Sequence, residues 1–515
     1  MRKFLVGLIL LFALSRAIEA ELYLPHIFSD NMVLQQKQDI PVWGKADPGE
    51  KVIVKLSGQQ IITYADEFGD WQVRLLPMEA GGPFEMTLQA TEVAKFVNVM
   101  IGEVWLCSGQ SNMEMGISLV ENGKQAIAEA NNTAIRLFHI RQKTSGYPIF
   151  DVNTAGGWKV CSPESLDNGA EWGGFSAIAY FFAQEIQKEL KVPIGVIDSS
   201  WGGTRIEPWI PVEGFALVPS LDNVIKLIDE ADITYQKNVG AWFDKIECWT
   251  KSVQKVNLIK PKQPLPLEPE WPVHPLNYYA QPTSIYNAMI YPLVPYGIRG
   301  VLWYQGEENI DDGSCYYEKM RALIDGWRKI WSQGEFPFYF VQLAPYDYTI
   351  TRAKNHSLPK IWEAQTAALK LPNTGMVVTL DLIYNLQDIH PINKLDVSKR
   401  LALLALSKTY GKIDVVYSGP IYKDMKIEGD KIRIYFDHTG SGLVSRNNEP
   451  LSWFEIAGQD NEFVKAEAII DAETVVVSNP QISSPKNVRF AWYQLAQPNL
   501  TNKEGLPAAA FRTSK

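Results

Sequence analysis

Cysteine and histidine are scarce in this sequence of 515 residues, which contains four cysteines and six histidines. The cysteines are scattered and form no CxxC pair or Cys/His cluster, so neither a zinc-binding motif nor a disulfide-framed scaffold is expected. We therefore expect no metal, and no pattern in the chain indicates an organic cofactor. The scarcity of histidine also shortens the search for a general base, because only six positions have to be compared.

Basic residues are in the minority, with 49 Lys and Arg against 58 Asp and Glu and a formal net charge of −9. Binding to nucleic acid requires a concentrated basic face, so a polyanionic partner is not expected. After the first twenty residues no run of about 18 uninterrupted apolar residues occurs, and we expect no membrane span in the mature chain. A small or neutral substrate fits this composition. The composition does not indicate an oligomeric state.

The first twenty residues have the pattern of an export signal. Arg2 and Lys3 precede the apolar run Phe4–Leu14, and Ala17-Ile18-Glu19-Ala20 has the small residues of a cleavage site. We expect residues 1–20 to be a signal peptide and the mature protein to be exported, either to a periplasm or as a secreted protein.

The length and composition predict several globular domains. Residues 21–99 alternate short β-rich runs with turn signals, which is typical of a β-sandwich. Residues 100–410 alternate buried-type strands with amphipathic helices, the pattern of an α/β domain. A Pro-rich insertion at about 205–295 interrupts this pattern, and we expect it to form a wall of the active site. Residues 411–515 are again rich in strands and predict a C-terminal β-domain.

The middle region predicts a mainly parallel sheet. Its candidate strands end in glycine-rich turns and are followed by apolar positions at helical spacing. In open α/β sheets the reactive groups gather at the carboxyl ends of the strands. The five candidate strands are Ile101–Cys107, Ile194–Asp198, Val301–Tyr304, Phe338–Leu343 and Met376–Leu380.

Ser111 is the candidate nucleophile. The strand Ile101–Cys107 leads directly into Ser108-Gly109-Gln110-Ser111-Asn112-Met113, which places Ser111 at the carboxyl end of that strand. A serine hydroxyl is a weak nucleophile unless a base lies within hydrogen-bond distance. A histidine is therefore expected beside it.

His390 is the histidine in the most suitable position. It follows the strand Met376–Leu380 and precedes a helical stretch, and Asp388 lies two residues before it. A carboxylate at that spacing can hold the imidazole tautomer and stabilise the protonated ring. The other histidines fall in the expected β-domains, in a strand-like run or in irregular loops: His26, His438, His139, His274 and His356.

Two further strand ends carry candidate donors for an oxyanion. In the loop Ser199–Thr204, a glycine such as Gly203 lets a backbone N–H approach a substrate oxygen. In the loop Trp303–Asn309, the side-chain amide of Gln305 is the candidate second donor. With Ser111 and His390, these residues should converge at one edge of the sheet.

These motifs together resemble the sialate O-acetylesterase family of SGNH hydrolases. The resemblance is carried by Gly109–Met113, Trp201–Gly203, Trp303–Glu307 and Asp388–Pro391, and it extends over nearly all of the mature chain. It implies an SGNH-hydrolase-like, flavodoxin-like parallel-sheet domain flanked by two β-sandwich-like domains. It also implies deacetylation of O-acetylated sugars by a metal-independent serine mechanism.

The resemblance also implies roles for single residues. Ser111 corresponds to the nucleophile, His390 to the base and Asp388 to its orienting acid, while Gly203 and Gln305 correspond to oxyanion donors. The supporting residues within the same motifs are Gly202, Asn112 and Glu307. The wider superfamily commonly has D-x-x-H where this chain has D-x-H, so Asp381, Glu307 or a backbone carbonyl stay open as alternative partners of His390.

Three alternatives to a sialate esterase are distinguishable. The same chemistry could act on acetylated plant polysaccharides such as xylan or xyloglucan. A glycosidase would pair Glu307 or Glu308 with Asp381 or Asp388 and would give Ser111 no role. A non-enzymatic carbohydrate-binding protein would fit two β-domains and 16 tryptophans but would leave the serine and histidine motifs unexplained.

Overall fold

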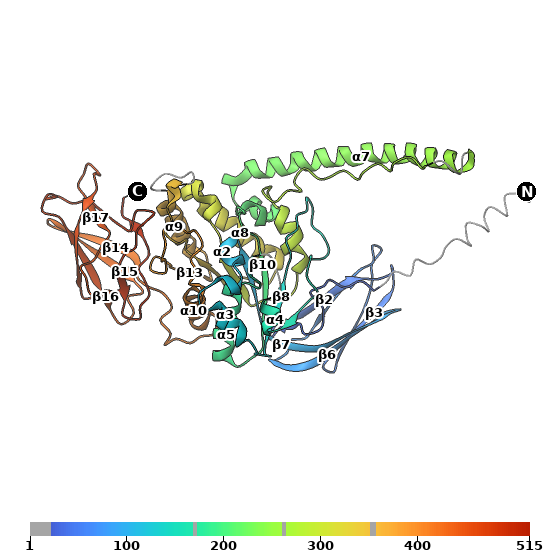
Figure 1. Ribbon diagram of the computed structural model, residues 1–515, viewed down its shortest axis with the longest axis horizontal. Helices are drawn as coiled ribbons and strands as arrows, with labels where there is room; N and C mark the ends of the chain where they lie inside the picture. The colour runs from blue at the N-terminus through green and yellow to red at the C-terminus, as the bar shows by residue number, and fades with distance from the viewer. Residues whose placement is uncertain (1–21, 168–171, 260–263, 351–356, 515) are drawn as a thin grey trace, which may run out of the picture.

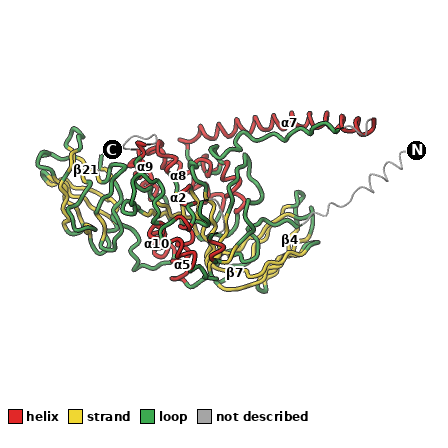
Figure 2. Tube along the Cα trace, viewed as in Figure 1, coloured by secondary structure: helices red, strands yellow, loops and turns green. Residues whose placement is uncertain are grey.

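The computed structural model describes residues 22–167, 172–259, 264–350 and 357–514. The predicted signal peptide, residues 1–20, lies outside this part of the chain. Figure 1 shows an elongated molecule with strands at both ends and a mixed region of strands and helices between them. In Figure 2 most of the helices gather around this middle region. The fold is mixed α/β, with further sheets on either side.

The middle region contains the parallel sheet that the sequence predicts. Its strands lie in the order β13, β12, β11, β7, β10, β8 and β9, and only the pairing of β8 with β9 is antiparallel. The five predicted strands are confirmed, although β7 begins well before Ile101, and β8 is an additional parallel strand. The bounds are β7 Val93–Gly109, β8 Ile135–His139, β9 Lys159–Val160, β10 Ile194–Ser200, β11 Gly300–Tyr304, β12 Phe338–Val341 and β13 Thr374–Val377.

Helices cover both faces of this sheet. On one face Trp105 of β7 meets Phe182 edge-on, with ring centroids 5.1 Å apart, and on the other face Trp303 of β11 meets Trp327 at 6.0 Å. Truncation of such a buried aromatic to alanine typically costs about 3–5 kcal/mol, so these contacts hold the helices firmly against the strands. Phe182 lies on α5 Ala177–Leu190, which packs beside α10 Lys394–Leu404, and Trp327 lies on α8 Tyr316–Trp331.

Strand β7 belongs to two sheets. Its first part pairs antiparallel with β6, and its last part lies between β10 and β11 in the parallel sheet. The expected boundary between residues 99 and 100 therefore lies inside one continuous strand. The remaining N-terminal strands are β1 Val33–Gln35, β2 Ile40–Lys45, β3 Lys51–Leu56, β4 Gln59–Tyr64, β5 Asp70–Leu75 and β6 Gly81–Gln89, of which β2 and β5 form a separate pair.

The C-terminal region consists of antiparallel strands in three small sheets. Bidentate contacts of 2.9 Å from Arg512 to Glu363 connect it to α9 Ser357–Ala367 in the middle region. The strands are β14 Ile421–Glu428, β15 Lys431–Asp437, β16 Leu443–Ser445, β17 Phe454–Ala457, β18 Val464–Lys465, β19 Glu467–Asp471, β20 Thr474–Ser478, β21 Asn487–Phe490, β22 Leu500–Asn502 and β23 Phe511–Arg512.

The predicted insertion at 205–295 contains a long helix, α7 Asp222–Ile259, that the sequence analysis did not identify. Its 38 residues correspond to roughly 57 Å of helix at 1.5 Å per residue, and Figure 1 shows most of it projecting from the body of the molecule. The Pro-rich segment returns along it, because the indole N–H groups of Trp242 and Trp249 donate to the carbonyls of Pro269 and Pro266. Among the described residues no helix, α7 included, combines the length and apolar character needed to cross a membrane.

Candidate functional site

Ser111 lies where the sequence analysis placed it, just beyond the carboxyl end of β7. Gly109 ends the strand with φ 144°, and a Cβ there would lie 2.2 Å from the carbonyl oxygen of Tyr304 on the neighbouring strand. The Gln110 N–H donates to that same carbonyl at 3.0 Å. Only glycine fits this approach, and the turn it permits starts a short helix, α2 Ser111–Glu114, with the serine as its first residue.

The histidine expected beside Ser111 lies within hydrogen-bond distance of it. His390 Nε2 lies 2.9 Å from Ser111 Oγ, although the two residues are 279 positions apart in the chain. The imidazole ring meets the ring of Trp172 edge-on, with centroids 4.9 Å apart. Burial lowers the pKa of His390, and the nearby Lys394 ammonium acts in the same direction. The ring is thus held near the hydroxyl and favoured in its neutral form, as a general base requires.

Asp388 does not make the contact expected of a triad acid. Its carboxylate accepts the backbone N–H of His390 at 2.9 Å rather than a proton from ring Nδ1. An aspartate that bonds to the N–H two residues later forms an Asx turn, which shapes the loop and not the ring. The carboxylate still acts on His390 through its charge, which raises the pKa of the imidazole against the effect of burial.

In the described structure, neither of the other carboxylates considered for this role bonds to the His390 ring. Asp381 forms a bidentate ion pair with Arg400, at 2.8 and 2.7 Å. Glu307 accepts the side-chain amide of Asn112 at 2.5 Å. A two-carboxylate glycosidase that used Asp381 would need it free to face a glycosidic bond, so its ion pair and the Ser111–His390 hydrogen bond oppose that pairing.

Asn112 joins the nucleophile turn to the loop that carries His390. Its Nδ2 also donates to the carbonyl of Ile389 at 3.0 Å, and its Oδ1 accepts from Lys394 Nζ at 2.5 Å. Lys394 is buried, which lowers its pKa to about 7, and burial also raises the pKa of Glu307. The Asn112 side chain therefore connects the end of β7 with the loop after β11 and with the loop that carries His390.

The glycine loop after β10 approaches Ser111 closely. A Cβ on Gly202 would lie 3.2 Å from Ser111 Cβ, and the Gly202 N–H already donates to the Glu114 carboxylate at 2.5 Å. Gly203 has φ 70°, and its α-carbon faces open space. In the described part of the chain, the Gly203 N–H has no hydrogen-bond acceptor. Of the two glycines, Gly203 is the one whose N–H is available to a substrate.

Gln305 is not placed as predicted. Its side chain is fully buried, and its amide donates to the carbonyl of Thr204 at 3.0 Å and to Asn309 Oδ1 at 2.8 Å. Its Oε1 accepts from the Tyr316 hydroxyl at 2.7 Å. Both N–H donors of this amide are therefore used inside the protein, and its oxygen is bonded there as well. Gln305 supports the loop after β11 and does not face Ser111, so its assignment as an oxyanion donor is corrected.

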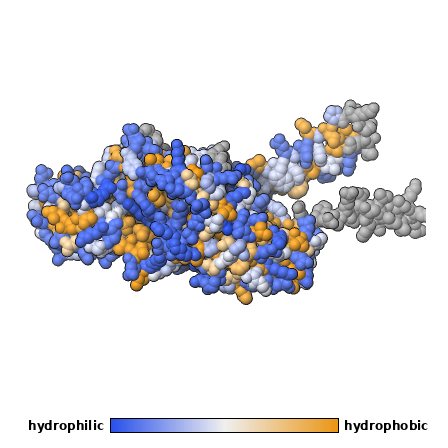
Figure 3. All heavy atoms as spheres, turned by 60° about the horizontal axis from the view of Figure 1, so that its bottom comes forward, coloured by the Kyte–Doolittle hydropathy of each residue, from blue (hydrophilic) through white to orange (hydrophobic). Residues whose placement is uncertain are grey.

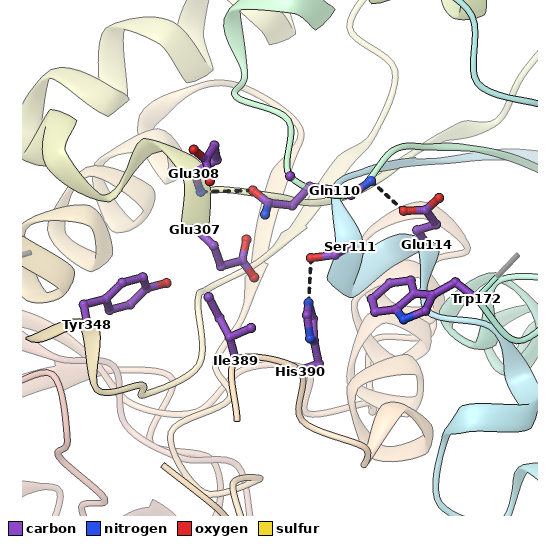
Figure 4. Close-up of a pocket in the computed structure, with 11 residues that line it drawn as sticks. Gln110, Ser111, Glu114, Trp172, Glu307, Glu308, Tyr348, Ile389 and His390 are labelled. Carbon is purple, nitrogen blue, oxygen red and sulfur yellow. Dashed lines mark hydrogen bonds between the residues drawn. The ribbon is translucent and has the colours of Figure 1, made fainter. Parts of the chain in front are cut away.

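Gln110 presents the side-chain amide that Gln305 was expected to supply. Its Oε1 accepts the backbone N–H groups of Gly306 and Glu308, at 3.1 and 3.3 Å. These two donors fix the orientation of the amide, because only the oxygen can accept them. Figure 4 shows the amide nitrogen turned to the side of Ser111 and Glu307. The sequence offered a signal for this position, since Gln110 directly precedes Ser111.

Ser111 and His390 face a pocket of about 510 Å³, drawn in Figure 4. None of its lining residues belongs to the described part of 205–295, so the insertion does not form the wall expected of it. Three of them lie outside the motifs of the sequence analysis: Glu114 ends α2, Trp172 lies in a turn and Tyr348 begins a short 3-10 helix. The lining consists of Gln110, Ser111, Glu114, Trp172, Gly202, Gly203, Glu307, Glu308, Tyr348, Ile389 and His390.

Comparison with known proteins identifies relatives along most of the chain. The family described as carbohydrate esterase, sialic acid-specific acetylesterase, matches residues 101–241 and 274–403. The chain is 30% identical over 432 residues to the sialate O-acetylesterase of Mus musculus and 31% identical over 437 residues to that of Homo sapiens. These alignments cover 78% of this chain and 76% and 74% of the two relatives. The family match omits residues 242–273, which form the outer part of α7 and much of the segment that returns along it.

A solved structure shares the overall arrangement. The chain is similar to a carbohydrate acetylesterase from Xanthomonas citri, with a TM-score of 0.79 and 33% sequence identity. The superposition covers 96% of this chain and 100% of the other. The similarity thus includes the strands at both ends of the molecule as well as the middle region.

Proposed function

Because the chain belongs to the sialic acid-specific acetylesterase family of carbohydrate esterases and is a carboxylic-ester hydrolase, we propose that it is a sialate O-acetylesterase with Ser111 as its nucleophile. The observation that carries this proposal is the 2.9 Å contact between Ser111 Oγ and His390 Nε2 inside a pocket. Membership of an esterase family rules out the purely carbohydrate-binding alternative.

The proposed reaction proceeds through an acyl-enzyme. His390 Nε2 takes the proton of Ser111 as Oγ attacks the acetyl carbonyl carbon, and a tetrahedral oxyanion forms. When it collapses, the bond from the acetyl carbon to the sugar oxygen breaks, and His390 returns its proton to that oxygen. A water molecule, deprotonated by His390, then attacks the acetyl-serine. Acetate leaves and the Ser111 hydroxyl is restored.

The oxyanion is proposed to be stabilised by the Gly203 N–H and the Gln110 amide. Both donors are fixed before substrate binds, one by the conformation of the glycine loop and the other by two backbone N–H groups that hold its oxygen. Donors that do not have to reorganise are the ones that contribute most to stabilising developing charge. Gly202, Asn112 and Glu307 are proposed as supporting residues that hold the two loops in register.

Asp388 is proposed to act on His390 from a distance. Its negative charge favours the imidazolium that forms when the ring takes the serine proton. Its hydrogen bond to the His390 backbone fixes the position of the loop. Packing against Trp172 is proposed to limit rotation of the ring, since no carboxylate among the described residues bonds to Nδ1.

The domain division and the export of the chain are also proposals. We propose a catalytic domain at 100–410, flanked by β-sandwich domains at 21–99 and 411–515, in an SGNH-hydrolase-like, flavodoxin-like arrangement. The strand pairings at both ends of the molecule support it. Export to a periplasm or to the outside rests on the pattern of residues 1–20 alone.

The test is acetate release from O-acetylated sialic acid, acetylated xylan and acetylated xyloglucan, measured side by side. Ser111→Ala should abolish release from whichever substrate is used. Ser108→Ala is the matched control, because Ser108 is buried three residues away and its Oγ has no hydrogen-bond partner in the described structure. Preference for xylan or xyloglucan would replace the sialate assignment and keep the serine mechanism. Release that survives Ser111→Ala would refute both.

A further inference from the structure

A second pocket, of about 850 Å³, lies in the C-terminal region. We call it the C-terminal pocket. It is formed by the residues around β17, the strands β18 and β19, and the segment that follows β21, and three of its lining residues are Trp453, Trp492 and Tyr493. Its volume lies in the range of small-molecule sites and exceeds that of the catalytic pocket. Figure 3 shows a hydrophobic area on the surface at this end of the molecule.

Trp453 is held in an unusual conformation at this pocket. Its φ is 65°, a left-handed value that is a genuine outlier for a bulky side chain and that persists only when the surroundings enforce it. The carbonyl of Trp453 accepts the N–H of Ala491, whose φ of 53° is also left-handed. Two residues in left-handed conformations are thus hydrogen-bonded to each other beside the pocket, and such strain is often found at binding sites.

The aromatic rings at the pocket form a platform. The ring of Trp453 is 39% exposed and lies within 14° of parallel to the ring of Tyr493, with centroids 6.1 Å apart. Trp492, beside Tyr493, packs under the Arg512 guanidinium at 4.9 Å. A partly exposed aromatic side chain such as Trp453 suits the flat C–H face of a pyranose ring, which is apolar while its rim of hydroxyls is polar.

The charged groups of the pocket are balanced. Arg489 and Glu455 form a bidentate pair, at 2.6 and 2.8 Å, and Lys465 and Glu467 lie on the adjoining strands. Two cations thus face two carboxylates, which leaves no net charge to attract an ionic ligand. Donors and acceptors are nevertheless both present, as the hydroxyl groups of a neutral sugar require.

The pocket is connected to the catalytic site by a short path. Gln494 follows Tyr493, accepts the Tyr346 N–H at 3.1 Å through its carbonyl, and donates through its side chain to Asp347 at 3.1 Å. Tyr348, one residue further on, lines the catalytic pocket. The residue that follows the wall of one pocket therefore bonds to the loop at the edge of the other.

We propose that the C-terminal pocket binds a neutral pyranose unit of a glycan, stacked on Trp453 and Tyr493. The proposal takes the carbohydrate class of ligand from the proposed function, but it assigns a site separate from the catalytic pocket. Binding there retains a glycan on the enzyme while its acetyl esters reach Ser111. An acidic sugar is disfavoured by the balanced charge of the pocket.

The experiment measures binding to the full chain with Ser111→Ala, so that no ester is consumed. Lactose, cellotetraose and xylotetraose are the neutral probes, 3′-sialyllactose is the acidic probe, and isothermal titration calorimetry gives Kd for each. At least one neutral probe should bind, and Trp453→Ala in the same background should weaken it about tenfold or more. Trp453→Phe should restore most of the affinity, because it retains a ring. Trp271→Ala, a half-exposed tryptophan outside the pocket, is the matched control and should bind normally.

Several outcomes would overturn the proposal: no neutral probe binds, only 3′-sialyllactose binds, or Trp453→Ala binds as well as its parent. If circular dichroism shows that Trp453→Ala is unfolded, the double variant Lys465→Ala/Glu467→Ala replaces it, since both side chains are exposed on strands. Unchanged affinity of that double variant would also contradict the proposal. The rate at which the wild-type protein hydrolyses p-nitrophenyl acetate should be unchanged at a saturating concentration of the probe. Competitive inhibition would show that the probe binds in the catalytic pocket instead. Absence of acetate release would refute the proposed function and leave this binding result intact.

Discussion

The two halves of the catalytic pair are supported in different ways. Ser111 follows directly from β7, at the centre of the sheet, where the neighbouring strands β10 and β11 fix its backbone. His390 lies in the irregular segment between β13 and α10, where a few side-chain contacts determine its position. We therefore expect the position of Ser111 to be robust to changes around it, whereas the position of His390 depends on individual residues such as Asn112.

The largest effect is expected when either member of the pair is removed. Ser111→Ala and His390→Ala should each reduce kcat by about five to six orders of magnitude, and the double variant should be little worse than either, because a nucleophile and its base act as one unit. Single-turnover kinetics with an acetyl ester measures all three. Additive losses would show that the two residues work separately, whatever their distance.

Gln110→Ala should have the next largest effect. Loss of one preorganised oxyanion donor typically reduces kcat by about 10²–10³-fold, and the serine–histidine contact should survive. KM for a small acetyl ester should change little, since the donor acts mainly on the transition state. Gln305→Ala serves as the comparison. If its loss were the larger and thermal unfolding stayed normal, the oxyanion role would return to Gln305.

Asn112→Ala tests whether the histidine loop depends on single contacts. Removal of the amide frees the Ile389 carbonyl and leaves Glu307 and Lys394 buried without their shared partner, so we expect kcat to fall by about tenfold to a hundredfold and the protein to lose roughly 1–3 kcal/mol of stability. Chemical denaturation and kcat for p-nitrophenyl acetate provide the measurements. Asn393→Ala, which removes the α10 cap only, is the control. Equal effects of the two variants on kcat would show that the position of the histidine loop does not depend on Asn112 in particular.

Asp388→Asn should have the smallest effect. The amide oxygen can still accept the His390 N–H, so the loop is retained, while the loss of negative charge lowers the pKa of the imidazole further. Activity requires the neutral ring, so it is lost as pH falls through that pKa. The acid limb of kcat/KM, already below the usual value of 6.5, should therefore move to lower pH, with a loss of plateau rate of about tenfold or less. A collapse of several orders of magnitude at every pH would instead establish Asp388 as a true triad acid.

The parallel sheet was predictable because buried strands have continuous apolar sequences that differ from the helices between them. The pair of Ser111 and His390 was predictable because strand ends and scarce histidines leave few combinations. The choice between Gln110 and Gln305 was not, since both amides lie at strand ends and only the packed structure shows which one is already bonded. Asp388 misled for a related reason. The i, i+2 rule assumes an extended backbone, whereas an aspartate can fold back onto its own loop.

Helix α7 shows a further limit of pattern reading. Its sequence is followed by the Pro-rich segment near Pro261–Pro272. The prediction for the whole insertion was based on that segment, and the helix before it was missed. Contacts to its outer part come from that returning segment, through the indole hydrogen bonds of Trp242 and Trp249 and the packing of Trp242 against Trp271.

The single strand β7 has a consequence for how the molecule unfolds. The 17 residues of β7 pair with the N-terminal strands at one end and with the parallel sheet at the other. If β7 unfolds, both sheets therefore lose one of their strands. The two should therefore melt together and protect their amides from exchange to similar degrees, as one cooperative unit. The C-terminal strands share no strand with that unit and are held to it by side-chain contacts such as Arg512 to Glu363. Heat or force should detach them first, leaving the serine and its histidine still assembled.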